Sequence, residues 1–150
     1  MKLLSTTFVF ALLFVFFPAK ATNGLITLQS QQSAKATMNK FELLAKNKGL
    51  TIFARIDHAA GAKKVGQQLG YTEVIIFGNP QGGTPLMQCA QTMGIDLPLK
   101  ALVWQDANAK VWLSYNDPSY LTKRHGAGQC AVATKLANVL AELAAQALQS

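Results

Sequence analysis

Leu99-Lys-Ala-Leu-Val-Trp-Gln105 and Lys110-Val-Trp-Leu-Ser-Tyr115 are two apolar runs of strand character, and Asp106-Ala-Asn-Ala109 separates them. Two such runs around a short polar segment predict a β-hairpin. A hairpin joins antiparallel strands directly, whereas a parallel sheet needs a longer crossover, usually a helix. The hairpin therefore favours a two-layer α+β fold, in which helices pack on one face of a mixed or antiparallel sheet.

Further strands and helices flank this hairpin. Apolar periodicity predicts strands over 24–29, 50–57 and 72–77 and helices over 33–47, 84–93 and 130–149. The resulting order is strand, helix, two strands, helix, two strands, helix. The most distinct element is the last helix, whose single apolar stripe comprises Val132, Leu136, Val139, Leu140, Leu143 and Ala147.

Two local signals set the middle of this order. Thr84 followed by Pro85 is typical of a helix start, so we expect the middle helix to begin there. Residues 58–70 contain three glycines, which disfavour a long helix, and we expect a turn or two of helix at most. A doubly wound parallel sheet would need a full crossover helix in this segment, so the α+β interpretation is preferred.

The first 21 residues have the three parts of an export signal. Met1 and Lys2 form a basic start, residues 8–17 are ten consecutive apolar residues, and Ala19-Lys20-Ala21 has the pattern of a cleavage site. Cleavage after Ala21 would leave a single domain, 22–150, and lower the formal net charge from +7 to +5, because the signal carries two lysines. We expect a periplasmic or secreted protein without stable membrane insertion, and an uncleaved anchor is the alternative.

Length and composition limit the remaining classes. The chain has 150 residues, of which 50% are apolar and 14% charged, so it can bury one core and does not resemble a disordered chain. It is too short for a (β/α)8 barrel. Its adjacent basic residues, Lys63-Lys64 and Lys123-Arg124, are isolated pairs without interleaved aromatic residues. We therefore expect no nucleic-acid partner.

The segment after the strand 72–77 is a candidate binding loop. It reads Asn79-Pro-Gln-Gly-Gly-Thr-Pro85 and leads into a helix. Free backbone N–H groups and the helix dipole favour an anion there, and glycines let a ligand approach the backbone. The expected ligand-binding residues are Asn79, Gly82, Gly83 and Thr84. The loop lacks a nucleotide-binding motif, and the alternative is a tight connection that needs Gly and Pro only for its backbone geometry.

Two other places combine polar and basic side chains. Residues 57–58 follow a strand end, where a carboxylate can orient a histidine base. Residues 115–125 bring polar, aromatic and basic groups together, as a pocket for an acidic or aromatic ligand would require. The candidate ligand-binding residues are Tyr115, Asp117, Lys123 and Arg124. The candidate catalytic residues are Asp57, His58, Asp117 and His125. The alternatives are a cap or turn at Asp57, a surface histidine, and a turn at 116–119 that begins a short helix.

The two cysteines, Cys89 and Cys130, are predicted to form a disulfide, because export places them in an oxidising compartment. They lack the C-x-x-C spacing of redox motifs. A metal site formed by both cysteines with His58 and His125 is the alternative, without a diagnostic ligand spacing. We accordingly predict no metal ligand and no cofactor.

Four segments carry a family resemblance. They are IDHA at 56–59, VIIFGNP at 74–80 with GTPLM at 83–87, IDLPLK at 95–100 and WLSYNDP at 112–118. On these segments the chain resembles the domain of unknown function family 302 over nearly all of residues 22–150. The resemblance implies a small α+β domain that is often exported, allows a homodimer, and implies no activity.

The sequence contains no legible pair of catalytic acids, activated nucleophile or metal triad. We therefore expect an exported ligand-binding or assembly module for a small acidic or amphipathic molecule. A small hydrolase or isomerase that uses a His/Asp pair is the alternative. A metal-binding protein is the second alternative.

Overall fold

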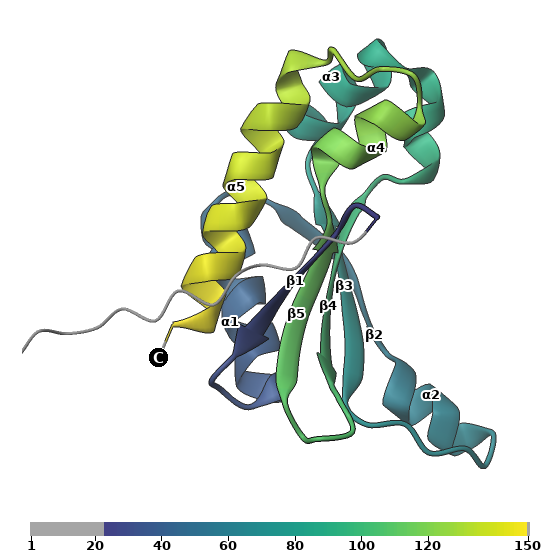
Figure 1. The fold of residues 1–150 in the computed structure, drawn as a ribbon, viewed down its shortest axis with the longest axis vertical. Helices are drawn as coiled ribbons and strands as arrows, with labels where there is room; N and C mark the ends of the chain where they lie inside the picture. The colour runs from purple at the N-terminus through teal and green to yellow at the C-terminus, as the bar shows by residue number, and fades with distance from the viewer. Residues whose placement is uncertain (1–22, 150) are drawn as a thin grey trace, which may run out of the picture.

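The computed structural model describes residues 23–149, which form five strands, five α-helices and one short 3-10 helix (Figure 1). In chain order they are β1 (Leu25–Ser30), α1 (Ala34–Asn47), β2 (Thr51–Asp57), α2 (His58–Lys64), β3 (Thr72–Gly78), α3 (Pro80–Cys89), the short 3-10 helix η1 (Gln91–Ile95), β4 (Leu99–Gln105), β5 (Val111–Asn116), α4 (Pro118–Arg124) and α5 (Ala131–Leu148). The predicted export signal, residues 1–21, lies outside the described residues.

The strands form one sheet in the order β1-β5-β4-β3-β2 (Figure 1). Each neighbouring pair is antiparallel. The hairpin predicted over 99–115 is β4–β5, with Trp104 opposite Trp112 and ring centroids 6.1 Å apart. The α+β fold class is therefore confirmed, with an antiparallel rather than a mixed sheet.

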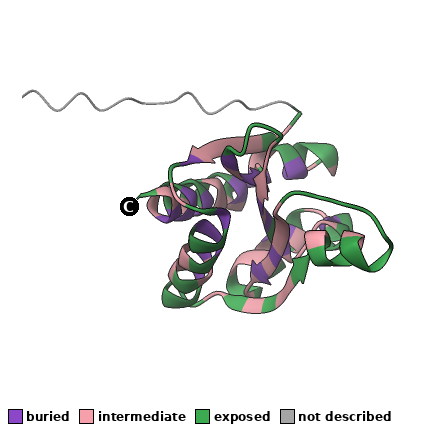
Figure 2. Ribbon diagram, turned by 90° about the horizontal axis from the view of Figure 1, so that it is seen from below, coloured by how far each residue is buried: buried purple, intermediate pink, exposed green. Residues whose placement is uncertain are grey.

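Helices α1 and α5 cover one face of this sheet, and the buried segments gather between the two layers (Figure 2). Phe41 of α1 meets Phe77 of β3 edge to face, with ring centroids 5.3 Å apart. The apolar stripe predicted for the last helix lies on α5, where Leu143 is fully buried. Burial of such aliphatic and aromatic surface is the main stabilising contribution to the fold.

The middle helix begins earlier than the sequence predicted. The Asn79 side chain caps it by accepting a hydrogen bond from the Gly82 backbone N–H at 2.8 Å. Pro80 occupies the first helical turn, where the missing N–H is tolerated. The expected start at Thr84 was wrong, because the Asn79-Pro80 pair five residues upstream provides an equivalent cap and Pro85 is accommodated inside the helix.

Residues 58–64 form the helix α2, in agreement with the short helix allowed there. Asp57 caps it, and its Oδ1 accepts from the Ala60 backbone N–H at 2.8 Å. None of the α2 residues is buried. The helix projects beyond the end of β2 and β3, away from the other helices (Figure 1).

Cys89 and Cys130 form the predicted disulfide, with 5.9 Å between their Cα atoms. It joins the end of α3 to the residue that precedes α5. Helices α3 and α5 thus have a covalent link at one end. Within residues 23–149 no helix has both the length and the apolar character required to cross a bilayer.

Candidate functional site

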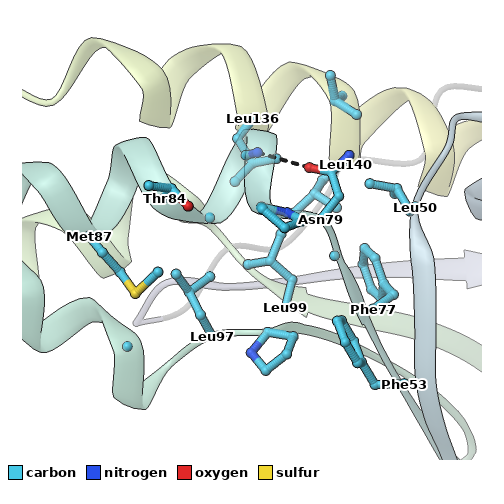
Figure 3. A pocket seen from close by; sticks show the side chains of 17 residues that line it. Leu50, Phe53, Phe77, Asn79, Thr84, Met87, Leu97, Leu99, Leu136 and Leu140 are labelled. Atoms are coloured by element: carbon cyan, nitrogen blue, oxygen red, sulfur yellow. Dashed lines mark hydrogen bonds between the residues drawn. The ribbon is translucent and has the colours of Figure 1, made fainter.

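A cavity of about 370 Å³ lies between α5, α3 and the strands β2 to β4 (Figure 3). Phe53, Phe77 and Leu99 line it from the sheet, and Leu136 and Leu140 line it from α5. The other lining residues are Leu50, Gly78, Asn79, Pro80, Gly82, Gly83, Thr84, Met87, Gly94, Leu97, Pro98 and Val139. The cavity is therefore bounded by the sheet and by two helices that the disulfide joins.

Two glycines of α3 help to leave this space open. A Cβ atom added to Gly83 would have only one atom of another residue within 4 Å, Leu97 Cδ1 at 3.8 Å, and Leu97 itself lines the cavity. A Cβ atom on Gly82 would have only Asn79 Oδ1 nearby, at 3.5 Å. Larger side chains at these two positions would extend into space that is now unfilled.

The edge strand β2 contributes Phe53 to the cavity lining through a β-bulge. The register of β2 against β3 shifts between Ile52 and Ala54, so Phe53 is the extra residue. Its side chain lines the cavity although Phe53 is 57% exposed. Phe53 therefore lies where the cavity meets solvent.

The cavity is apolar, and none of its 17 lining residues is charged. Its polar side chains are Asn79 and Thr84. Asn79 Oδ1 accepts from the Gly82 N–H, the bond visible in Figure 3, and the Asn79 backbone oxygen accepts from the Gly83 N–H at 3.0 Å. Two of the amides expected to bind an anion are thus already bonded within the helix. Within residues 23–149 the Asn79 side-chain nitrogen and the Thr84 hydroxyl have no hydrogen-bond partner, so both are available to a ligand.

The four residues predicted from the 79–85 segment all line the cavity. In contrast, the residues predicted from 115–125 do not: Tyr115, Asp117, Lys123 and Arg124. Asp117 caps α4 by accepting from the Ser119 N–H at 2.9 Å, as in the structural alternative given above. Tyr115 is buried, and this burial, with the Asp117 charge, raises the pKa of its hydroxyl.

None of the candidate catalytic residues Asp57, His58, Asp117 and His125 forms an Asp/His pair with another of them within residues 23–149. The carboxylate of Asp57 caps α2, and His58 is exposed. Asp57 lies opposite Glu73 at the start of β3, whereas Asn79 follows the end of that strand. Residues 57–58 therefore lie at the opposite end of the sheet from the cavity-lining helix α3.

His125 has a partner that the sequence did not reveal. Its Nε2 lies 2.7 Å from Asp96 Oδ2, and its Nδ1 lies 3.0 Å from the Thr92 hydroxyl. Arg124 Nη1 donates to Asp96 Oδ1 at 3.0 Å. The cluster ties η1 and the turn after it to the end of α4, and none of its residues lines the cavity. The LPLK motif directly after Asp96 gave no signal for this pairing, which depends on contact between segments 29 residues apart.

A second ionic cluster is centred on Arg55 of β2, and its residues do not line the cavity. Arg55 donates to Glu73 through Nε and Nη2, at 2.7 and 2.8 Å, and to Glu42 of α1 through Nη1 at 2.7 Å. The hydrogen bonds from Arg55 lower the pKa of Glu73. Those from Lys46 and Arg55 lower the pKa of Glu42. Burial, with the hydrogen bond to Glu73, raises the pKa of Tyr71.

The residues considered for a metal site are not assembled as one. The sulfur atoms of Cys89 and Cys130 are joined in the disulfide. Across residues 23–149 no group of three or more His, Cys, Asp or Glu side chains could hold a metal ion. The geometry therefore does not support the metal-binding alternative.

Comparisons with known proteins agree with this architecture. The crystal structure of an uncharacterized conserved DUF302 protein from Bacillus stearothermophilus matches with a TM-score of 0.74, over 83% of this chain and 98% of that chain, at 16% identity. Two relatives, from Brucella suis biovar 1 (strain 1330) and Brucella abortus biovar 1 (strain 9-941), are each 50% identical over 106 residues, which is 71% of this chain. Both are named fluoride-specific ion channel FluC 1, and the matched region spans only 42% and 39% of their lengths.

The family model described as "Domain of unknown function DUF302" matches residues 26–143. This match includes every strand except the first residue of β1, and most of α5. It contains all the cavity-lining residues. The chain therefore belongs to the DUF302 family.

Proposed function

We propose that this domain binds a small amphipathic molecule, whose apolar part fills the cavity and whose polar end reaches Asn79 and Thr84. One observation carries the proposal: a cavity of about 370 Å³ with an uncharged, mainly apolar lining. Small-molecule sites typically have volumes of about 300–1,000 Å³ and combine an apolar lining with a few polar groups. From the sequence of residues 1–21 we further propose that the domain acts after export.

The chemistry of the lining favours an uncharged polar group over an acidic one. No Lys, Arg or His side chain lines the cavity, and an unpaired anion in an apolar site is strongly disfavoured. The Asn79 side-chain nitrogen can donate a hydrogen bond, and the Thr84 hydroxyl can donate or accept one. The same argument disfavours fluoride as a ligand of this cavity, although the Brucella relatives are named as fluoride-specific channels.

Binding can be tested with N-phenyl-1-naphthylamine, an uncharged apolar dye whose fluorescence rises in apolar surroundings. We expect the wild-type chain to enhance its emission saturably. Gly83→Leu should abolish this enhancement, because the new side chain would occupy the cavity beside Leu97. Gly61→Leu is the matched control, since a Cβ atom on Gly61 has nothing within 4 Å and that residue lies on α2.

Competition distinguishes the classes of ligand. 1-Decanol should displace the dye at lower concentration than decanoate, because only decanoate brings a charge to the uncharged lining. Equal dye binding by wild type and Gly83→Leu, with both proteins folded by circular dichroism, would reject the cavity as the site. Stronger displacement by decanoate would reject the uncharged head group.

A further inference from the structure

The segment 58–70, formed by α2 and the residues that follow it, extends away from the folded layers (Figure 1). Most of its length is exposed (Figure 2). Two large aliphatic residues in it face solvent, Val65 with 72% and Leu69 with 52% of its surface exposed. Neither belongs to the core or packs against it. We call residues 58–70 the arm.

The arm is also basic. Lys63 and Lys64 occupy the last turn of α2 and form no ion pair with any residue in the range 23–149. Residues 58–70 include no Asp or Glu. The preceding carboxylate, Asp57, is bonded to the Ala60 N–H as the helix cap. The positive charge of the lysine pair is therefore not compensated within the arm.

Three other basic residues of the domain are paired with carboxylates. Lys46 and Lys48 pair with Glu42 and Glu142, and Arg124 pairs with Asp96. Among residues 23–149 the arm thus combines adjacent unpaired lysines with exposed aliphatic side chains. It contains no Phe, Tyr or Trp, the aromatic residues on which single-stranded nucleic-acid bases commonly stack.

We propose that the arm docks the domain on an anionic lipid bilayer, with Lys63 and Lys64 at the lipid phosphates and Val65 and Leu69 in the interface. Segments that bind a bilayer surface in this way combine exposed apolar side chains with Lys or Arg. Long lysine side chains keep their ammonium groups at the head groups while their methylene groups contact apolar surface. The charge of the arm complements an anionic surface, and its apolar residues gain an environment that they lack in water. This docking does not depend on the cavity or on its ligand.

Cosedimentation with vesicles tests the proposal. The chain is mixed, at low salt, with phosphatidylcholine vesicles that contain 30 mol% phosphatidylglycerol, and separately with pure phosphatidylcholine vesicles. We expect binding to the anionic vesicles only, weakened when NaCl is raised because the lysines are exposed. Lys63→Gln and Lys64→Gln should weaken it about fivefold each. Val65→Ser/Leu69→Ser should also weaken vesicle binding relative to the wild type, although it leaves the charge unchanged.

Lys35→Gln/Lys135→Gln is the matched control, because it removes the same charge from exposed positions on α1 and α5. It should retain more than half of the wild-type binding. Equal losses in this control and in Lys63→Gln/Lys64→Gln would attribute the binding to net charge and overturn the assignment to the arm. If the folded wild-type protein does not bind anionic vesicles, the docking proposal is overturned. If Val65→Ser/Leu69→Ser binds as strongly as the wild type, the proposed contacts of Val65 and Leu69 with the bilayer are overturned. The dye assay with Gly83→Leu reports separately on the cavity.

Discussion

The face of the sheet that the helices cover has two halves that differ in packing. Side chains fill the space between α1 and the sheet (the filled half), whereas a cavity remains between α3 and the sheet (the open half). Helix α1 presents Met38 and Phe41, which are fully buried against the sheet. Helix α3 presents Gly82 and Gly83, and there the cavity lies. Helix α5 spans both halves: Leu143 is completely buried in the filled half, whereas Leu136 is half-buried beside the cavity.

This difference shows that the apolar stripe of α5 both packs the core and lines the cavity. Protein interiors are normally packed with few voids larger than a water molecule, so the filled half is the ordinary case. The open half retains lining residues of the same chemical type, and two of the α3 residues that line it are glycines. We infer that the filled half carries most of the stability and the open half is available for binding.

Removing the disulfide should have the largest effect on this comparison, because it joins α3 to α5 beside the open half. Loop-closure entropy for cysteines 41 residues apart predicts that Cys89→Ser/Cys130→Ser lowers the free energy of unfolding by about 4 kcal/mol. Urea unfolding of the variant and of the wild type checks this value. A loss below about 1 kcal/mol would mean that packing alone holds the two helices together.

Truncating the two α5 leucines compares the halves directly. Leu143→Ala should lower the unfolding free energy by about 3 kcal/mol, because it creates a new cavity in a fully packed region. Leu136→Ala should lower it by about 1 kcal/mol, because its side chain already borders unfilled space. Urea denaturation of both variants measures the difference. Equal losses would show that the open half is packed as tightly as the filled half.

The ionic cluster around Arg55 joins β2 and β3 to α1, the helix over the filled half, and Arg55 lies two residues after Phe53. Because Arg55 lowers the pKa of Glu73 in the folded state, Glu73 contributes stability above its unfolded pKa of about 4.3, and this contribution is lost as the pH falls below that value. Glu73→Gln should therefore cost about 2 kcal/mol at pH 7 and less at pH 3. Urea unfolding of the wild type and of Glu73→Gln between pH 7 and pH 3 measures how this cost changes with pH. An equal cost at both pH values would exclude the carboxylate charge as the cause.

The fold was predictable because its signals are local. The hairpin over 99–115 and the stripe on α5 each depend on residues close together in the sequence, and both were confirmed. The start of the middle helix was mispredicted, because Asn79-Pro80 and Thr84-Pro85 give similar local signals and only one of them caps the helix.

The candidate site was predictable only in part. The 79–85 segment was identified from its glycines, and its four expected residues line the cavity. The apolar lining was missed, because a hydrophobic stripe has the same sequence pattern over packed and unfilled space. Phe53 depends on a bulge in β2, and the Asp96 partner of His125 depends on tertiary contact. Neither is encoded in local spacing.

The smallest predicted effect concerns Gly83, and it tests whether the glycine that borders the cavity lowers the stability of the fold. Glycine inside a helix is disfavoured relative to alanine by about 0.5–1 kcal/mol, and the methyl group of Gly83→Ala would meet Leu97 Cδ1 at an ordinary contact distance of 3.8 Å. Gly83→Ala should therefore raise the unfolding free energy by about 0.5–1 kcal/mol in urea titrations. Gly61→Ala, on exposed α2, should give a similar gain without touching the cavity. If Gly61→Ala stabilises and Gly83→Ala destabilises, the backbone under α3 needs glycine for packing, and the space is a structural requirement. If both stabilise, folding alone does not explain the glycine at position 83, and the unfilled volume is best explained by what it binds.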